Sequence, residues 1–339
     1  MTRTGRLASS LALAAAALTA LACLARAGRP KAVSWRGRVA VITGGARGLG
    51  LALARELCAD GVVVWLVSRS QDQLTRAVDQ LRAGGAEAHA HACDVTQPDA
   101  VAQMVDAIIQ RHGRLDVVIN NAGVMTAMPF HNAAVSDFEE SLATHFWAPL
   151  HVIRAALPWL RRAHPGHIVN ISSIGGRVGV PHLAPYCAGK FALTGLSEVL
   201  RAELARDHVW VTTVTPGLMR TGSVGQVKVR GRHEAEATWF AAMAATPVTS
   251  MSAAAAARAI VDAAKRGRAA ATPGWQARTL HGLNAVAPEL TAASMELVAA
   301  AVLPAAVPGP SDARTVKSLH LGWGETLLSP SLEVAYNQR

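Results

Sequence analysis

The sequence predicts an α/β protein built on one doubly wound parallel sheet, and three observations indicate it. From residue 38 onward, short apolar runs alternate with longer stretches of helical periodicity. Strands that are apolar along their whole length are buried on both faces, as in parallel sheets covered by helices. A glycine-rich turn joins the first strand to the first helix, and hydrophobic residues make up 51% of the 339 residues, enough for a large core.

The strands and helices are expected in a regular order. Two helices end at glycine signals, the first at Gly84-Gly85 and the second at Gly113, the latter with Thr96 as its expected N-cap. Ligands of such sheets bind at the carboxyl ends of the strands. The strands are expected at 38–43, 61–68, 115–123, 167–173 and 209–217, with weaker ones at 86–95 and 268–274.

Three segments are expected along the chain. Residues 1–35 form a hydrophobic N-terminal segment, 36–280 a single catalytic domain, and 281–339 a helical extension with an irregular tail. Residues 218–250 break the rhythm of the domain with glycines, basic residues and a Trp-Phe pair. That composition predicts a helical, mobile lid over the site.

The stretch from Leu7 to Ala25 carries no charge, and basic residues flank it, with the larger excess on its C-terminal side. Nineteen helical residues span about 28 Å, close to the thickness of the hydrocarbon core. We expect a single-pass membrane anchor that leaves the catalytic domain in the cytoplasm. A cleaved signal peptide ending near 25–27 and an Ala-rich surface helix are the alternatives.

Charge and cysteine content limit the partners. Lys and Arg number 33 against 23 Asp and Glu, a net charge of +10 that favours phosphates or acidic surfaces. Aromatic residues make up only 4%, and no basic run is interleaved with them, so nucleic acid is not an expected partner. The four cysteines are scattered without a CxxC pair, so neither a metal site nor a disulfide framework is expected.

The glycine-rich turn "TGGARGLG" at 43–50 is a candidate dinucleotide site. Its glycines permit a tight turn and a close approach to a pyrophosphate, which the following helix N-terminus would attract. Similar turns also serve packing alone. Arg47 lies in this turn and Arg69 follows Ser68, where NAD-preferring sites carry an acid. Two guanidinium groups suit a 2′-phosphate and predict NADP(H), although solvated surface arginines would give the same pattern.

Tyr186 and Lys190 are four residues apart and share a helix face. A phenol is a poor base at neutral pH, but a neighbouring ammonium lowers its pKa, so the pair can exchange a proton. Ser173 ends the preceding strand and could hold a substrate oxygen. A Tyr-x-x-x-Lys pair by itself is common on helices.

In combination these motifs make the chain resemble the short-chain dehydrogenase/reductase family over roughly residues 36–275. The resemblance implies a Rossmann-type fold and hydride transfer between a nicotinamide and a carbonyl or alcohol. The matches, in family order and spacing, are Thr43-Gly44-x-x-x-Gly48-x-Gly50, Asp94, Asn120-Asn121-Ala122-Gly123, Ser173, Tyr186-x-x-x-Lys190 and Pro216-Gly217.

The resemblance also implies residue roles. Tyr186 would give or take the proton, Lys190 would bind the nicotinamide ribose and tune Tyr186, and Ser173 would position the reacting oxygen. The implied cofactor-binding residues are Gly44, Arg47, Gly48, Leu49, Gly50, Ser68, Arg69, Asp94, Val95, Asn121, Ala122, Gly123, Tyr186, Lys190, Pro216, Gly217 and Thr221.

One position departs from the family pattern. In the stretch "ATHFWAP" at 143–149, His145 takes the place of a family Asn that holds a water linking Lys to solvent. An imidazole can serve the same relay by hydrogen bonding, so we count His145 with the catalytic residues. A packed or capping histidine is the alternative.

Two functions of different classes follow. The first is an NADP(H)-dependent oxidoreductase acting on a small apolar carbonyl or alcohol, because the lid offers Met219, Val224, Val227, Trp239, Phe240 and Met243. The second is a dinucleotide-binding sensor or scaffold without turnover, which need not retain Ser173, Tyr186 and Lys190. A tethering role would depend on residues 7–25 alone, and a homo-oligomer is compatible with either function.

Overall fold

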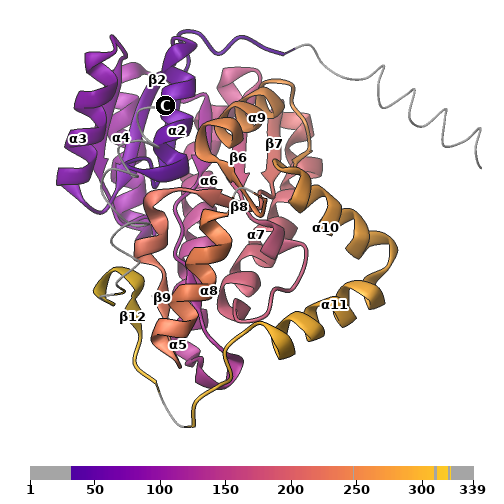
Figure 1. Cartoon of the computed structure of the whole chain (residues 1–339). Helices are drawn as coiled ribbons and strands as arrows, with labels where there is room; N and C mark the ends of the chain where they lie inside the picture. The colour runs from indigo at the N-terminus through magenta and orange to yellow at the C-terminus, as the bar shows by residue number, and fades with distance from the viewer. Residues whose placement is uncertain (1–31, 247, 309–310, 320, 322–339) are drawn as a thin grey trace, which may run out of the picture. The chain divides into compact units, whose positions relative to one another are not determined.

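The protein is described by a computed structural model covering residues 32–246, 248–308, 311–319 and 321. The chain divides into two units, Met1–Val33 and Ser34–Arg339. The second unit is built on a seven-stranded parallel sheet with the order β11-β7-β6-β4-β1-β2-β3 (Figure 1). The strands are β1 Val39–Thr43, β2 Val63–Ser68, β3 Ala88–Ala92, β4 Val117–Asn120, β6 Gly166–Ile171, β7 Val209–Val214 and β11 Ala270–Ala271.

Helices cover both faces of this sheet, which confirms the predicted doubly wound fold. On one face lie α2 (Gly48–Ala59), α3 (Gln71–Ala83) and α9 (Ala253–Lys265). On the other lie α4 (Pro98–His112), α6 (Ala148–Ala163) and α7 (Ala184–Glu203), which enclose the larger hydrophobic core. The connections lead outward in opposite directions from β1 and β4, so a ligand crevice is expected at the carboxyl ends of these two strands.

Side-chain hydrogen bonds and a left-handed glycine mark the ends of the helices, and they correct one predicted N-cap. Ser70 caps α3 by accepting from the Gln73 amide at 3.4 Å, as a short hydroxyl side chain does. Thr96 does not cap α4 as predicted, because its hydroxyl donates to Asp94 Oδ1 at 2.8 Å. Gln97 is the N-cap instead, and the helix ends at Gly113 in the left-handed conformation, with φ at 67°.

The predicted lid contains helix α8 (His233–Ala245), strand β8 (Leu218–Arg220) paired with β10 (Ser250–Ser252), and strand β9 (Lys228–Val229). Strand β9 lies between β5 (Thr126–Ala127) and β12 (Arg314–Thr315) in a small separate sheet. The tail expected to be irregular thus adds a short strand. Its pairing could not be foreseen, because two residues carry no periodicity.

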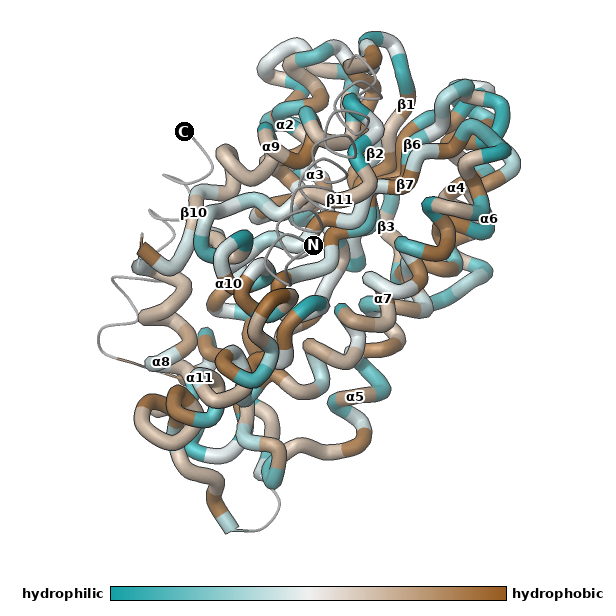
Figure 2. The backbone as a smooth tube through the Cα atoms, turned by 90° about the vertical axis from the view of Figure 1, so that its right-hand side faces the viewer, coloured by the Kyte–Doolittle hydropathy of each residue, from teal (hydrophilic) through white to brown (hydrophobic). Residues whose placement is uncertain are grey.

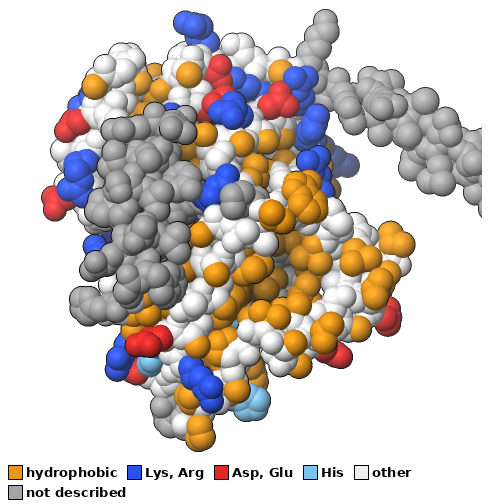
Figure 3. All heavy atoms as spheres, in the orientation of Figure 1, with side chains coloured by type: hydrophobic (Ala, Val, Ile, Leu, Met, Phe, Trp, Pro, Cys, Tyr) orange, Lys and Arg blue, Asp and Glu red, His pale blue; other side chains and the backbone are white. Residues whose placement is uncertain are grey.

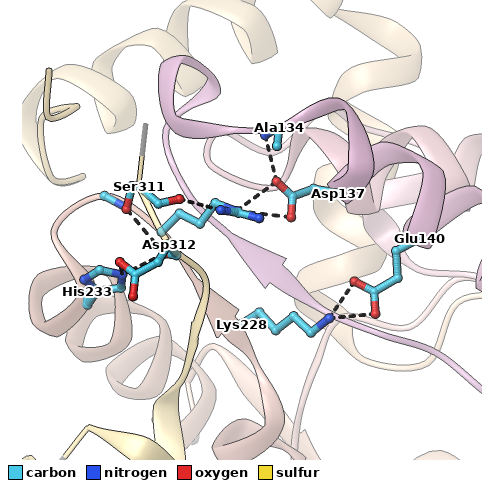
Figure 4. A network of polar contacts seen from close by, with 9 residues as sticks. Ala134, Asp137, Glu140, Lys228, His233, Ser311 and Asp312 are labelled. Carbon is cyan, nitrogen blue, oxygen red and sulfur yellow. Dashed lines mark hydrogen bonds and ion pairs between the residues drawn. The ribbon is translucent and has the colours of Figure 1, made fainter. Parts of the chain in front are cut away.

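Ion pairs fasten this part of the lid to helix α5 (Val135–Leu142), as Figure 4 shows. Arg230 Nε lies 3.0 Å from Asp137 Oδ2, and Lys228 Nζ lies 2.6 Å from Glu140 Oε2. The Asp137 carboxylate is 4% exposed, so its pairing is protected from solvent. These ion pairs anchor Lys228–Arg230 of the predicted lid to α5.

Beyond the sheet, helices α10 (Trp275–Val286) and α11 (Pro288–Ala301) pack against each other as a hairpin. Their ribbons carry many hydrophobic residues (Figure 2), and the space-filling view shows apolar side chains over the hairpin and in the hollow between it and the body of the unit (Figure 3). Several large ones are exposed, namely Trp275, Val286, Leu290, Leu297 and Val302.

The prediction of a single-pass membrane protein with a cytoplasmic domain is contradicted. None of the helices in the described ranges is both long enough and apolar enough to cross a bilayer. The longest of them, α7, carries Lys190, Glu198 and Arg201 as well as polar residues, in keeping with a helix that packs on a sheet. The stretch 7–25, on which the prediction depended, lies outside the described residues.

Candidate active site

The glycine turn lies between β1 and α2, and its glycines stand where a Cβ would be crowded. A Cβ on Gly50 would collide with the carbonyl oxygen of Gly44. Gly48 has φ of 54°, and a Cβ there would lie 3.0 Å from Ser223 Oγ and 3.6 Å from Thr221 Cβ. The turn therefore faces the start of the lid, and Thr221 lies beside Gly48.

Hydrogen bonds join the end of β4 to the end of β1. The hydroxyl of Thr43 accepts from the backbone amides of Asn121 and Ala122, each at 3.0 Å. The Asn121 side-chain amide donates to the carbonyls of Thr43 and Gly44 at 3.0 and 3.1 Å. A small gap beside these hydrogen bonds is lined by Thr43, Val95 and Ala122, among others. Asn121 thus fixes the shape of the glycine turn.

Ser173, Tyr186 and Lys190 meet at the same edge of the sheet. Ser173 follows β6, accepts from the Gly175 amide at 3.1 Å, and shares a side-chain hydrogen bond with Tyr186. Lys190 Nζ lies 5.7 Å from the centroid of the Tyr186 ring. Its hydrogen bond goes to the carbonyl oxygen of Ile171 at 2.8 Å. The helix α7 places the phenol and the ammonium on one face, as their spacing predicts.

Burial acts on both titratable groups of this pair. It raises the pKa of Tyr186 to about 12, with the Ser173 hydrogen bond acting in the opposite direction. It lowers the pKa of Lys190 to about 7. The pKa of Tyr186 is therefore raised, and the expected lowering by Lys190 is not found. Burial of a lysine without a carboxylate partner favours its neutral form, and a neutral amine cannot stabilise a phenolate.

His145 lies in a π-helical turn, Ala143–Trp147, between α5 and α6. Its ring packs edge-on against Tyr186, with centroids 5.3 Å apart. Nε2 lies 2.8 Å from the Val124 carbonyl, which fixes the proton on that nitrogen. Nδ1 is buried and has no hydrogen-bond partner within the described ranges. Burial and nearby Lys190 hold the pKa of His145 well below its usual range, so the ring is neutral and Nδ1 is an open acceptor.

The residues expected around an adenosine are also gathered near the turn. The Gly45 amide donates to Val67 O at 3.2 Å, which brings the end of β2, Ser68 and Arg69, beside the glycine turn. Arg69 is exposed, whereas Arg47 is the partly buried N-cap of α2. Asp94 follows β3 and accepts from the backbone and hydroxyl of Thr96.

Pro216 and Gly217 follow β7 at the same edge. The carbonyl of Pro216 accepts from the Ile174 amide at 2.9 Å, which ties this loop to the turn after Ser173. A Cβ on Gly217 would lie 3.4 Å from Ala277 of α10. Helix α10, which crosses from the predicted domain into the extension, therefore borders the site, and its Asn284 side chain donates to the Arg177 carbonyl at 3.3 Å.

Sequence reasoning missed the main-chain carbonyls of Ile171 and Val124, which orient Lys190 and His145. It also missed Asn170, whose fully buried amide joins Asn120 and Ser197 at 2.8 Å each. A carbonyl leaves no trace in a residue's identity. A polar Asn in the middle of an otherwise apolar strand was a usable signal for the buried network.

The sequence matches the model of the short chain dehydrogenase family over residues 38–230. An uncharacterized oxidoreductase of Mycobacterium tuberculosis is 33% identical over 199 residues, 57% of this chain and 58% of that relative. The chain thus spans less than two thirds of the length of this relative. An 11-beta-hydroxysteroid dehydrogenase-like protein of Arabidopsis thaliana is 34% identical over 257 residues, 75% of this chain and 82% of the relative.

Solved structures share the same architecture. A variant of the actinorhodin polyketide ketoreductase with NADPH is 29% identical, with a TM-score of 0.62 over 70% of this chain and 95% of that one. A short-chain dehydrogenase from Streptomyces avermitilis is 28% identical, with a TM-score of 0.65 over 77% and 96%. The fold, the site geometry and the family match agree, and the chain belongs to the short-chain dehydrogenase/reductase family.

Proposed function

We propose that the protein is an NADP(H)-dependent oxidoreductase that interconverts an apolar carbonyl compound and its alcohol. One observation carries this proposal: Ser173, Tyr186 and Lys190 converge at the carboxyl edge of the sheet, the edge at which the glycine turn also lies. A nicotinamide dinucleotide bound at this edge would supply or accept the hydride.

Each of the three side chains has a different role in the reaction at the substrate oxygen. Ser173 can hold it by a hydrogen bond while Tyr186 gives a proton to it or takes one from it. Charged Lys190 would favour the phenolate. Because burial lowers the pKa of Lys190 to about 7, an anionic ligand beside it would restore its charge. Proton transfer by Tyr186 thus becomes more favourable when the dinucleotide site is filled.

His145 is proposed as the next member of the proton path. Its open Nδ1 can accept a hydrogen bond from Lys190 or from a water between them, and its Nε2–H is held by Val124. The π-helical turn supports this role, because such irregularities are frequent at functional sites.

NADP(H) is favoured over NAD(H) by Arg47 and Arg69, with Ser68 where an acid would otherwise stand. Permanently charged, forked donors suit a 2′-phosphate better than a ribose hydroxyl. The solved relatives include complexes with NADPH, NADP and NAD, so the family alone supports either dinucleotide. We further assign Asp94 and Val95 to the adenine, Asn121, Ala122 and Gly123 to the length of the cofactor, and Pro216, Gly217 and Thr221 to the nicotinamide.

An apolar substrate is supported by the surroundings of Tyr186. A cavity of about 480 Å³ lies between α11 and the loop that leads into α7. Its walls include Phe130, Val180, Pro181, Ala184 and Ala299. Val180 and Tyr186 pack against the same apolar cluster, which contains Leu183 and Cys187, so a carbonyl at the phenol could extend an apolar body toward this cavity.

The cofactor preference is tested by titrating the purified protein with NADPH and NADH. Arg69→Ala should weaken NADPH by roughly tenfold to a hundredfold, since a charge-assisted hydrogen bond contributes about 1.5–3 kcal/mol. NADH should be nearly unaffected. The matched control is Arg76→Ala, which removes an exposed arginine of helix α3 that has no assigned role in cofactor binding. Equally tight binding of both dinucleotides by the parent protein would refute the assignment.

A further inference from the structure

A second group of chemically capable side chains lies at the opposite edge of the sheet. Glu87 directly precedes β3, His89 is in that strand, and His112 is the last residue of α4. Strand β3 is at the end of the sheet, and these residues are at its amino end, away from the carboxyl edge that holds Tyr186. The dehydrogenase mechanism has no use for them.

The geometry of this group is compact. One ligand atom from each of Glu87, His89 and His112 lies within 4.8 Å of the other two. His89 Nε2 is 3.3 Å from Glu87 Oε1, and the two imidazole rings have centroids 5.2 Å apart. His112 Nε2 is buried and has no hydrogen-bond partner within the described residues. Native proteins rarely leave a buried polar atom unpaired, so this nitrogen calls for a ligand.

We propose that Glu87, His89 and His112 bind one divalent transition-metal ion, with Zn²⁺ as the best fit. Two imidazole nitrogens and one carboxylate oxygen are a donor set that zinc accepts, with water in the fourth position. Zinc–ligand bonds of about 2.0–2.2 Å place neighbouring ligand atoms roughly 3.3 Å apart in a tetrahedron. His89 and Glu87 already have that separation, and His112 offers a ligand atom within 4.8 Å of theirs.

The site would fasten edge strand β3 to the end of α4. Glu87 is 57% exposed, which gives the ion a path from solvent, while Trp65 closes the inner side with its ring 5.0 Å from His89 and 5.9 Å from His112. The lack of paired cysteines had predicted no metal site. That argument excludes thiolate sites and is silent on histidine and glutamate.

The test is a calorimetric titration of the EDTA-treated, tag-free full-length protein with ZnCl₂. We expect one zinc per chain. His112→Gln should weaken binding at least about tenfold, because even outer-sphere partners of a metal contribute about 10–100-fold. Zinc should raise the melting temperature of the parent but not of this variant. His281→Gln, which removes a partly exposed histidine on α10, should bind as the parent does.

A second readout needs no substitution of a ligand. Cu²⁺ held between His89 and His112 should quench the fluorescence of Trp65, and Trp65→Phe should remove that quenched component. Absence of stoichiometric zinc binding by the parent would overturn the proposal. So would equal zinc affinity in the His112→Gln and His281→Gln variants, or quenching that persists unchanged in Trp65→Phe. None of these outcomes depends on the dehydrogenase activity.

Discussion

Two buried histidines, one at each end of the sheet, show what distinguishes a functional side chain from a structural one. His145 at the carboxyl end and His167 at the start of β6 are each 1% exposed. Burial lowers the pKa of both, in His167 to about 3. His167 uses both ring nitrogens, accepting from Trp35 Nε1 at 3.2 Å and bonding to the Ala264 backbone. His145 keeps Nδ1 without a partner among the described residues and packs on Tyr186.

Burial and neutrality are thus common to both positions and carry no information about function. The difference is that His145 Nδ1 is an acceptor without a partner among the described residues, and that it lies next to Tyr186 and Lys190. We therefore expect substitutions of Tyr186 and His145 at the carboxyl end to change turnover with little change in stability. Substitutions at the amino end should do the reverse.

Tyr186→Phe should have the largest effect on turnover. The change removes only the hydroxyl, so kcat should fall by about 10²–10⁴, the usual contribution of a positioned proton donor. The affinity for NADPH and the melting temperature should stay close to those of the parent. Steady-state kinetics with a parallel fluorescence titration of NADPH measure both. A variant that retains near-normal kcat would show that Tyr186 is not the proton donor.

Lys190 should make the stability of the ligand-free protein depend on pH. Its folded pKa of about 7 lies below the usual value of 10.5, so between these limits the unfolded chain holds a proton that the folded protein has released. Stability therefore rises from about pH 7 to about pH 9, at about 1.4 kcal/mol per pH unit. Above pH 9 the Cys58 and Cys93 thiols oppose the rise, because burial raises their pKa from 9.0 to about 11. Urea unfolding at several pH values measures the rise, which Lys190→Met should remove. An unchanged rise in that variant would assign it to another group.

His167→Leu should destabilise the protein by about 1–3 kcal/mol, because it leaves the buried Trp35 Nε1 without an acceptor. The kcat of the folded enzyme should not change. Denaturant midpoints and initial rates, measured on the same preparation, test the two statements. A loss of kcat without a loss of stability would reverse the roles that we give the two ends.

His145→Leu should lower kcat by on the order of a hundredfold or less, since the relay lies one step behind the group that transfers the proton. His145→Asn should retain most of the activity, because an amide can still donate to Val124 and accept through its oxygen. Equal kcat values in the parent and in the leucine variant would show that His145, like His167, has only a structural role.

The sequence was sufficient for the sheet because each strand is a separate apolar run, and for Tyr186 and Lys190 because a helix fixes their relative positions. It could not predict that Lys190 donates a hydrogen bond to the Ile171 carbonyl, or that Thr43 and Asn121 join the ends of β1 and β4 by hydrogen bonds. These contacts depend on tertiary packing. The raised pKa of Tyr186 has the same origin. The pair β9 and β12 was missed because each is a two-residue strand with a charged residue, in a stretch that is not an apolar run.

The central claim is that the site turns over rather than only binding a dinucleotide. The direct measurement is NADPH consumption by the full-length protein against a panel of apolar aldehydes and ketones, with the alcohol product quantified by mass spectrometry. We expect NADPH loss that requires a carbonyl compound, matches the alcohol formed and disappears in Tyr186→Phe. Tight NADPH binding with no carbonyl-dependent consumption across the panel, or consumption that continues unchanged in Tyr186→Phe, would contradict the account and favour a dinucleotide sensor.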